Sequence, residues 1–261
     1  MSEPVVEFRE IAGLKTAYCV LGAGQPVLTL HGWGASLRNF WPVAEDLAPN
    51  GYAVHLLDLP GFGETALPPE PWRVSDYVRF VFAYLDDAGL DRVALLGHSF
   101  GGRIALVLAA DAPERVSKMV LANSAGLRAP LSLRQQIRNR AARSVRSILQ
   151  ALGQERLRNR LQARYNRRFA SEDYLTAGPL RETFVRVIEE DLSPYAERVQ
   201  APTVLIWGDQ DADTPLWQGQ KLEQLIPDAG LIVFEGAGHY SYTDRLPDYI
   251  RIVDHFLKDG S

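Results

Sequence analysis

A serine between two glycines stands at the end of an apolar run in this chain. The segment Val93–Gly102 reads Val-Ala-Leu-Leu-Gly-His-Ser-Phe-Gly-Gly, and the apolar, helix-like stretch Ile104–Ala110 follows it. The glycines on either side of Ser99 remove β-carbons that would clash in a tight strand-to-helix turn. Such a turn is strained and exposes the hydroxyl. The pattern G-x-S-x-G in this setting predicts that Ser99 is a nucleophile.

Two later loops contain the residues that a nucleophilic serine needs as partners. A serine hydroxyl is a poor nucleophile near neutral pH, so a histidine must take its proton and a carboxylate must fix the tautomer of that histidine. The loop Gly208–Pro215 contains three aspartates, and the later loop Glu235–Tyr240 contains His239. Each loop follows an apolar run. His239 is therefore the candidate general base, and one of the three aspartates is the candidate acid.

The elements that must position these loops are predicted by short apolar runs that alternate with segments of helical period. This alternation is typical of an α/β protein whose central sheet is mostly parallel, with helices on both faces. Strands are expected at Pro26–Leu30, Ala53–Leu57, Arg92–Leu96, Lys118–Ala122, Thr203–Trp207 and Leu231–Phe234. Helices are expected at about 36–48, 73–88, 100–111, 216–226 and 245–257. An N-terminal hairpin of strands 5–11 and 16–21, with the turn 12–14, precedes them.

The alternation is interrupted over residues 125–199, where helical patterns occur without a convincing strand. We expect this segment to be a helical lid inserted into a core domain formed by residues 1–124 and 200–261. Residues 128–168 contain twelve arginines and one acid, Glu155. The spacing predicts two amphipathic helices separated near Gly153. Two interpretations stay open, a solvated helix face and a basic surface that binds an acidic partner.

Composition excludes several classes of protein. The chain has 261 residues, of which 46% are hydrophobic and 23% charged, and its formal net charge is −4. These values exclude disordered, collagen-like and coiled-coil proteins, and the acidic balance argues against a nucleic-acid partner. No apolar stretch is long enough to span a membrane, and the polar N-terminus does not resemble a signal peptide, so we expect a cytoplasmic protein. The single cysteine, Cys19, is expected to be a buried apolar residue.

Taken together, these motifs resemble those of the α/β-hydrolase superfamily, from about residue 16 to the C-terminus, with a weak match in the insertion. In that family the catalytic acid follows the pattern G-x-x-D-x-x-x-P, which Gly208, Asp211 and Pro215 match. The resemblance therefore implies that Asp211 is the acid. His239 matches the family's G-x-G-H loop, which supports its role as the base.

The resemblance implies structural rather than catalytic roles for the neighbouring polar residues. Asp209 and Asp213 are then expected to be turn and helix-capping residues. Some relatives carry the acid after the strand that precedes the insertion. In this chain Asn123 and Ser124 stand there, and neither is an acid. Asp211 therefore keeps the role.

The resemblance also implies that the loop His31–Gly34, with the sequence His-Gly-Trp-Gly, is an oxyanion loop. A tetrahedral intermediate needs two N–H donors, and the resemblance assigns them to the backbones of Trp33 and Phe100. His31 is expected to hold the loop by hydrogen bonding. The segment Leu57–Thr65 matches the family's D-x-P-G-x-G-x-S pattern and is expected to brace the loop. The predicted substrate-binding residues are His31, Gly32, His98 and Tyr240.

A serine nucleophile implies an acyl-enzyme intermediate. It argues against the haloalkane dehalogenases and epoxide hydrolases of this superfamily, whose nucleophile is an aspartate. Carboxylic-ester hydrolysis is the first expectation, because it needs only the triad of Ser99, Asp211 and His239 and an oxyanion hole. The sequence has no metal, flavin or nucleotide motif, so no cofactor is expected.

Three alternatives stay open. The loop His31–Gly34, the segment Leu57–Thr65 and the arginine-rich insertion resemble the methyl esterases that release pimeloyl-acyl-carrier protein, in which an acidic carrier protein docks on basic lid residues. Those enzymes usually have tryptophan where this chain has His98. The carbon–carbon bond hydrolases of aromatic-ring breakdown recognise a substrate carboxylate with a lid arginine, but their oxyanion loop has more glycines and asparagine precedes their serine. The third alternative is a hydrolase-like receptor that binds a small ligand.

Overall fold

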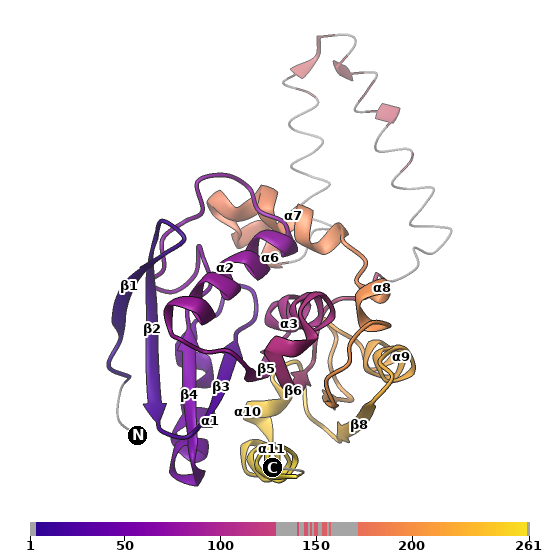
Figure 1. Ribbon diagram of the computed structural model, residues 1–261. Helices are drawn as coiled ribbons and strands as arrows, with labels where there is room; N and C mark the ends of the chain where they lie inside the picture. Colours follow the sequence, from indigo (N-terminus) through magenta and orange to yellow (C-terminus); the bar gives the residue numbers. More distant parts are fainter. Residues whose placement is uncertain are drawn as a thin grey trace.

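One mixed sheet forms the centre of the molecule. The computed structural model describes residues 4–128, 140, 144–145, 147, 149–150, 153–155, 157 and 172–259. In this part of the chain eight strands pair in the order β1-β2-β4-β3-β5-β6-β7-β8 (Figure 1). β2 is antiparallel to both β1 and β4, and the remaining neighbours are parallel. The strands are β1 Glu7–Ile11, β2 Leu14–Gly22, β3 Gln25–Leu30, β4 Tyr52–Leu57, β5 Val93–His98, β6 Val116–Ala122, β7 Thr203–Gly208 and β8 Ala229–Phe234.

The apolar runs of the sequence form the parallel strands, as predicted. All six residues of β5 are buried, because a parallel strand covered on both faces must be apolar along its length. The N-terminal hairpin has a shorter turn than predicted, since Ile11 pairs directly with Leu14. Its two turn residues, Ala12 and Gly13, have φ of 50° and 77°. Positive φ at both positions gives the tight turn that matches the twist of a hairpin.

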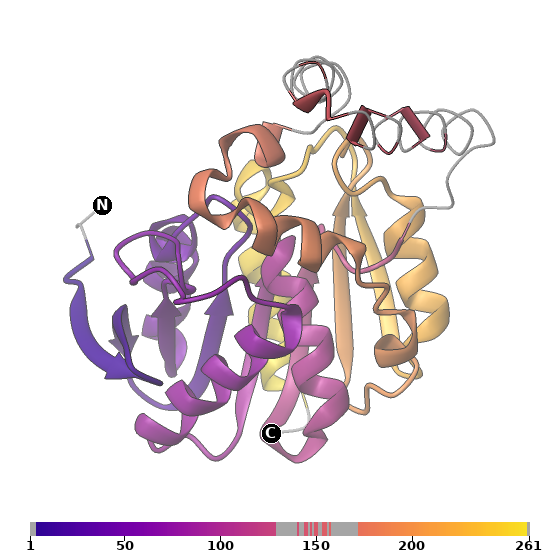
Figure 2. The ribbon, with the colours of Figure 1, turned by 90° about the horizontal axis from the view of Figure 1, so that it is seen from above.

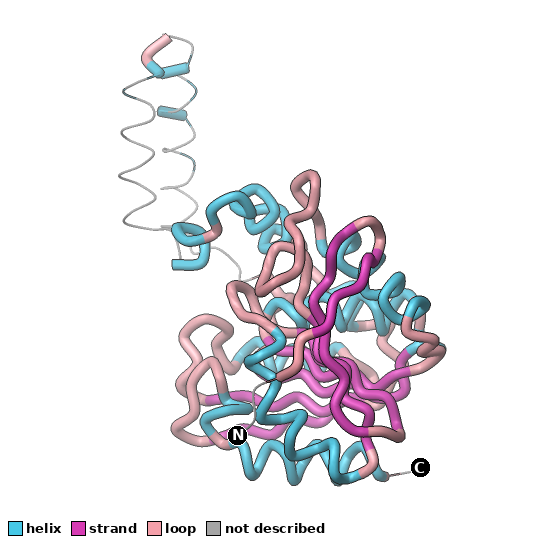
Figure 3. Tube along the Cα trace, turned by 90° about the vertical axis from the view of Figure 1, so that its left-hand side faces the viewer, coloured by secondary structure: helices cyan, strands magenta, loops and turns pink. Residues whose placement is uncertain are grey.

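Helices cover both faces of the sheet (Figure 2). On one face, α2 (Val74–Asp87), α3 (Phe100–Asp111) and α9 (Trp217–Leu225) pack on one apolar core. On the other face, α1 (Trp41–Leu47) and α11 (Leu246–Lys258) pack on a second core. Figure 3 shows the twisted strands between these layers. Parallel strands end at the same edge, so the loops after β3, β5, β6, β7 and β8 meet there.

Shorter elements complete the core domain. The helix predicted at 36–48 is divided into η1, α1 and η2, with Pro42 in the first turn of α1 and Gly51, at φ 94°, after η2. The additional short elements are η1 Leu37–Phe40, η2 Ala48–Asn50, η3 Pro113–Arg115 and α10 Ser241–Asp244. Cys19 is buried in β2, as expected.

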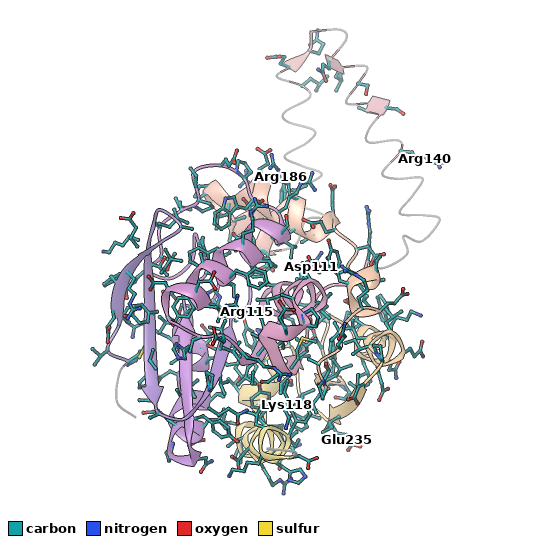
Figure 4. The ribbon with its side chains drawn as sticks, in the orientation of Figure 1. Asp111, Arg115, Lys118, Arg140, Arg186 and Glu235 are labelled. Atoms are coloured by element: carbon teal, nitrogen blue, oxygen red, sulfur yellow. The ribbon has the colours of Figure 1, made fainter. Side chains whose placement is uncertain are left out.

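The C-terminal helix is held to the sheet by a lysine. Lys118 of β6 lies beside the end of α11 (Figure 4), and its Nζ donates to the carbonyls of Phe256, at 2.6 Å, and Leu257, at 3.1 Å. A cation at a helix C-terminus satisfies carbonyls that have no partner within the helix and interacts favourably with the helix dipole.

The described part of the predicted insertion is helical. Residues 172–199 contain no strand, and their elements are α6 Glu172–Thr176, η4 Gly178–Leu180, α7 Arg181–Glu189 and α8 Ser193–Ala196. They pack on the first core through buried Leu180, Val187, Leu192 and Ala196. The two arginine-rich helices predicted around Gly153 lie largely outside the described residues. In the part of the chain that is described, no helix has the length and hydropathy needed to cross a membrane.

Candidate active site

Ser99 lies at the turn between β5 and α3, with φ 49° and ψ −110°. Its N–H donates to the carbonyl of Ala122, at 3.2 Å, and its carbonyl accepts from Gly102 N–H, at 3.0 Å. A non-glycine residue takes a positive φ only where the surrounding structure forces it to do so. The strained strand-to-helix turn predicted from G-x-S-x-G is therefore present, and Ser99 borders a cavity.

Two glycines allow the loop after β3 to lie against this turn. A β-carbon at Gly101 would collide with the backbone carbonyls of Leu30 and His31. A β-carbon at Gly32 would lie 2.8 Å from His98 Nδ1 and 3.4 Å from Ser99 Cβ. The predicted oxyanion loop is thus in direct contact with the predicted nucleophile.

His239 and Asp211 form a hydrogen-bonded pair at the same edge of the sheet. His239, on the loop after β8, has its Nδ1 2.9 Å from Asp211 Oδ2, and Asp211 lies on the loop after β7. A carboxylate only accepts, so Nδ1 carries the proton in this pair and neutral His239 has a free Nε2 lone pair. Ser99 and His239 line the same cavities. This arrangement is what a general base beside a serine requires.

The buried Asp211 carboxylate is surrounded by donors. Besides His239, its Oδ2 accepts from Asn123 Nδ2 and Thr214 Oγ1, both at 2.6 Å. Its Oδ1 accepts from the N–H of Asp213 at 2.8 Å and of Thr214 at 3.0 Å. Burial alone would raise the pKa of Asp211, but the hydrogen bonds from His239 and Thr214 outweigh it and lower the pKa to about 2. Asp211 is therefore ionised at neutral pH.

Asn123 and Thr214 are members of this network that the sequence motifs did not identify. Asn123 follows β6, has φ 45°, and its Oδ1 accepts from the hydroxyl of Ser241. This contact fixes the amide so that Nδ2 points to Asp211. The available signal for Asn123 was its place at the end of a predicted strand of the same sheet. Thr214 had no comparable signal.

Replacement of Asn123 by alanine is expected to lower kcat about tenfold with little change in KM. A hydrogen bond to a charged group contributes about 1.5–3 kcal/mol, and about 1.4 kcal/mol corresponds to a factor of ten in rate. Asn123→Gly is the matched variant, because it removes the amide and also relieves the positive φ. Steady-state kinetics measures kcat, and thermal unfolding checks that each variant folds. Equal losses of kcat in Asn123→Ala and Asn123→Gly would assign the effect to the amide. A kcat of Asn123→Gly equal to that of wild type would contradict a role for the amide.

The loop after β3 is held by His31, as expected. Its Nδ1 donates to the carbonyl of Gly32 at 2.8 Å, and its Nε2 accepts from the N–H of Leu59 at 3.0 Å. Leu59 belongs to the segment 57–65, which therefore braces the loop. The Asp58 carboxylate of that segment accepts from the N–H groups of Leu37, at 2.6 Å, and Glu64, at 2.8 Å. His31 is 1% exposed and lines neither of the two cavities beside Ser99.

Trp33 and Phe100, the predicted oxyanion donors, both line the cavity that Ser99 borders. In the part of the chain described, neither N–H has a hydrogen-bond acceptor. The Phe100 N–H is the first of α3, where a helix has free donors. The Trp33 ring packs edge-on against Phe62, Phe100 and Phe184. Two free donors beside a serine are the arrangement that stabilises an oxyanion.

Two cavities share Ser99 and His239 in their walls. The first, of about 270 Å³, is the apolar cavity, and its walls include Trp33, Phe100, Arg103, Ala125, Phe184, Val187 and Ile188. The second, of about 410 Å³, is the polar cavity, and its walls include Gly32, Gly34, His98, Thr176 and Tyr240. Trp33, Asp173 and Asp213 border both. A substrate whose reacting carbon lies at Ser99 could extend into both cavities.

His98 and Tyr240, which are predicted to bind substrate, both line the polar cavity. His98 is buried, and its Nε2 donates to the carbonyl of His239 at 2.9 Å. Burial and the neighbouring His239 ring lower the pKa of His98 to about 3. His98 is therefore neutral at ordinary pH. It holds the backbone of the predicted base, and its ring stacks near that of Tyr240, at 5.0 Å between centroids.

The remaining aspartates of the acid loop have different surroundings. Asp209 accepts from the N–H of Gly236 at 2.8 Å, which is the turn role expected of it. Asp213 borders both cavities. Asp211, Asp213 and His239 offer ligand atoms that lie within 4.8 Å of one another. However, the Asp211 oxygens already accept five hydrogen bonds, so the donor set fits a hydrogen-bonded carboxylate and histidine better than a metal site.

The chain belongs to the family described as the alpha/beta hydrolase fold, whose model matches residues 25–246. It is 30% identical over 92% of its length to the 2-hydroxy-6-oxo-6-phenylhexa-2,4-dienoate hydrolase of Burkholderia cepacia, of which the match covers 90%. It is 31% identical over 91% of its length to the pimeloyl-[acyl-carrier protein] methyl ester esterase of Chromobacterium violaceum, with 96% of that protein covered. A meta-cleavage product hydrolase from Pseudomonas fluorescens has the same fold, with a TM-score of 0.75, 23% identity and 98% of each chain covered. The protein is therefore a hydrolase.

Proposed function

We propose that the protein is a serine hydrolase that cleaves carboxylic esters through an acyl-enzyme. The observation that supports this most strongly is the hydrogen bond between His239 Nδ1 and the ionised Asp211, in a pair that shares two cavities with Ser99. In this proposal Ser99 is the nucleophile, His239 the general base and Asp211 the acid. Trp33 and Phe100 supply the oxyanion donors.

In the first half of the reaction, Ser99 Oγ attacks the ester carbonyl while His239 Nε2 takes its proton. The negative charge on the carbonyl oxygen is stabilised by the N–H groups of Trp33 and Phe100, which need not reorganise because they already lack acceptors. Asp211 stabilises the positive charge on the His239 ring. Collapse of the intermediate expels the alcohol, which receives the proton from His239, and leaves an acyl group on Ser99.

In the second half, water attacks the acyl carbon and His239 takes its proton. The same two N–H groups stabilise the second oxyanion. The carboxylic acid leaves, and Ser99 regains its proton from His239. No group outside the described site is needed for either half.

A panel of p-nitrophenyl esters of increasing acyl length tests this proposal. We expect turnover with a burst of p-nitrophenol equal to the enzyme concentration wherever deacylation limits the rate. The acyl length with the highest kcat/KM would report the size of the cavity that the acyl group occupies. Absence of turnover on the whole panel, with a correctly folded protein, would contradict the proposed function.

Carbon–carbon bond hydrolysis is the second candidate. It is favoured by the relative from Burkholderia cepacia, whose name is that of a hydrolase of a 2-hydroxy-6-oxo dienoate. The decisive comparison is kcat/KM for that dienoate against kcat/KM for the best p-nitrophenyl ester. A higher value for the dienoate would favour this second candidate.

The arginine-rich segment 128–168 leads to a separate proposal about a partner. If it recruits an acidic carrier protein, kcat/KM for a carrier-bound ester should fall steeply as salt is added, because exposed charge attraction is screened over about 8–10 Å near physiological ionic strength. Hydrolysis of a small neutral ester should barely respond. Replacement of Arg138, Arg143 and Arg146 by glutamine should affect only the carrier-bound substrate. Equal loss on both substrates would instead mean that these arginines, which lie outside the described residues, maintain the fold.

A further inference from the structure

Arg103 carries a buried positive charge on the wall of the apolar cavity. The residue is 5% exposed and lines this cavity, but not the polar one. Burial lowers the pKa of Arg103 to about 10, with the nearby Glu190 and Asp191 opposing the shift, so the guanidinium stays protonated at neutral pH. A charged side chain is almost never this buried unless it is paired, because a charge without a partner is strongly disfavoured in an apolar environment.

Among the described residues, no carboxylate forms a close ion pair with Arg103, although Glu190 and Asp191 are near enough to favour its charged form. Arg103 Nη2 donates to the backbone carbonyl of Glu190, whereas the Glu190 carboxylate accepts from the N–H of Val74 at 3.1 Å. Arg103 Nε has no acceptor in the part of the chain described. None of the ion pairs between described residues includes Arg103. The guanidinium thus has unused donor capacity and no directly bonded carboxylate in the part of the chain described.

The place of Arg103 on α3 directs it toward the nucleophile. Ser99 directly precedes α3 and Arg103 comes four residues later, so both lie on one face, about 6 Å apart along the helix axis. Helical side chains lean toward the N-terminus of their helix, which here is the end where Ser99 lies. Between them the cavity is walled by apolar side chains, among them Phe184 and Val187 of α7.

Two acids line the apolar cavity together with Arg103. Asp173 and Asp213 border both cavities, as do Ser99 and His239. They therefore belong to both cavities, whereas Arg103 belongs to the apolar cavity alone. A ligand that extends from Ser99 along this cavity meets apolar side chains first and a positive charge at its end.

We propose that Arg103 binds a carboxylate at the far end of the substrate. The proposal rests on the proposed esterase function and adds its substrate class, an ester that carries a free carboxylate separated from the reacting carbonyl by a short apolar chain. The planar guanidinium matches a carboxylate with two parallel hydrogen bonds. Such a pair is stronger in a cavity with little water than at the surface. The substrate carboxylate would supply the directly bonded acceptor that Arg103 Nε lacks among the described residues.

Two matched pairs of esters test the proposal. Monomethyl adipate is compared with methyl hexanoate, where the carboxylate is on the acyl side, and 6-acetoxyhexanoate with hexyl acetate, where it is on the alcohol side. In at least one pair the wild-type enzyme should have the higher kcat/KM for the anionic ester. Arg103→Gln should lower that ratio at least about tenfold, because truncation of one partner of a buried charge pair removes most of the interaction. The affected pair tells which part of the substrate occupies the apolar cavity.

Arg103→Lys and Arg198→Gln complete the design. Arg103→Lys keeps the charge without the planar fork and should give an intermediate ratio. Arg198 is exposed and pairs with Asp111 at the other end of α3, at 2.8 Å, so Arg198→Gln should keep the wild-type ratio. Use of a ratio cancels any general loss of activity, and circular dichroism checks that each variant folds. If Arg103→Gln does not fold, Arg103→Lys still tests the proposal through its ratio.

Calorimetric titration with adipate separates this proposal from the proposed function. Adipate should bind wild-type enzyme, Arg103→Gln should weaken its binding about tenfold or more, and Arg103→Lys should weaken it by a smaller factor. If no ester is hydrolysed but adipate binding depends on Arg103, the esterase function fails and the carboxylate site stands. If esters are hydrolysed with the same ratio in wild type, Arg103→Gln and Arg103→Lys, the carboxylate site is wrong and the esterase function stands.

Discussion

Ser99→Ala is expected to abolish ester hydrolysis and to leave the fold intact. The hydroxyl is the group that attacks in the proposed mechanism, and without it no acyl-enzyme forms. The remaining oxyanion donors and cavities stabilise the uncatalysed attack of water only weakly, so kcat should fall by about 10⁴-fold or more. Alanine keeps the β-carbon at φ 49°, so the strain of the turn is unchanged. Steady-state kinetics and circular dichroism measure the two effects.

An independent readout of the same residue is covalent labelling. An organophosphate ester should add one phosphoryl group to the wild-type protein, at Ser99, and none to Ser99→Ala, as measured by intact-protein mass spectrometry. Ser75→Ala is the matched control, because Ser75 is exposed in the first turn of α2 and should be labelled and active like wild type. A tenth or more of the wild-type kcat in Ser99→Ala would exclude the covalent mechanism.

Asp211→Asn is expected to lower kcat by several orders of magnitude, on the scale of about 10⁴. The asparagine amide can donate to His239 Nδ1, which selects the tautomer with its proton on Nε2, where it cannot accept the proton of Ser99. The variant also removes the negative charge that stabilises the His239 ring when protonated. KM should change much less than kcat, because Asp211 is buried behind His239 and does not line either cavity.

The neighbouring aspartates are the controls for this variant. Asp209→Asn should retain activity, because Asp209 Oδ1 binds the N–H of Gly236 in a surface turn. Asp213→Asn should be much less damaging than Asp211→Asn, since Asp213 borders the cavities without bonding to His239. If either control lost as much activity as Asp211→Asn, the assignment of the acid would be wrong.

The low pKa of Asp211 also predicts how its ionisation affects stability. The pKa is about 2 in the folded protein and about 3.9 for an unperturbed aspartate. A carboxyl group whose pKa is lower in the folded than in the unfolded protein stabilises the fold at pH values above its unfolded-state pKa. This stabilisation is lost as the pH falls toward the folded-state pKa. The thermal stabilities of wild type and Asp211→Asn should therefore converge as the pH falls from about 5 to 2.

The local patterns of the sequence determined the class of fold and two of the three candidate catalytic residues, Ser99 and His239. A parallel strand covered on both faces needs an apolar run, and a strand-to-helix turn that exposes a serine needs glycines around it. Both requirements are met within a few consecutive residues, so they can be read without knowledge of the rest of the chain. Local patterns were not sufficient to identify the catalytic acid. Asp211 could be chosen among three aspartates only through a resemblance, because nothing local distinguishes it from Asp209 and Asp213.

Only the tertiary structure decided which residues surround these three. Asn123 reaches Asp211 across 88 positions of the sequence, because β6 and β7 are neighbours in the sheet and end at the same edge. In the sequence, nothing distinguishes Arg103 from the other residues of an apolar helix. In the structure, Arg103, Ser99 and residues of α7 line one cavity. The burial of Arg103 and the shape of the cavity arise from contacts between distant segments, whereas a sequence motif spans only neighbouring positions. For that reason the sequence indicated the reaction, whereas packing decided what surrounds the reacting groups.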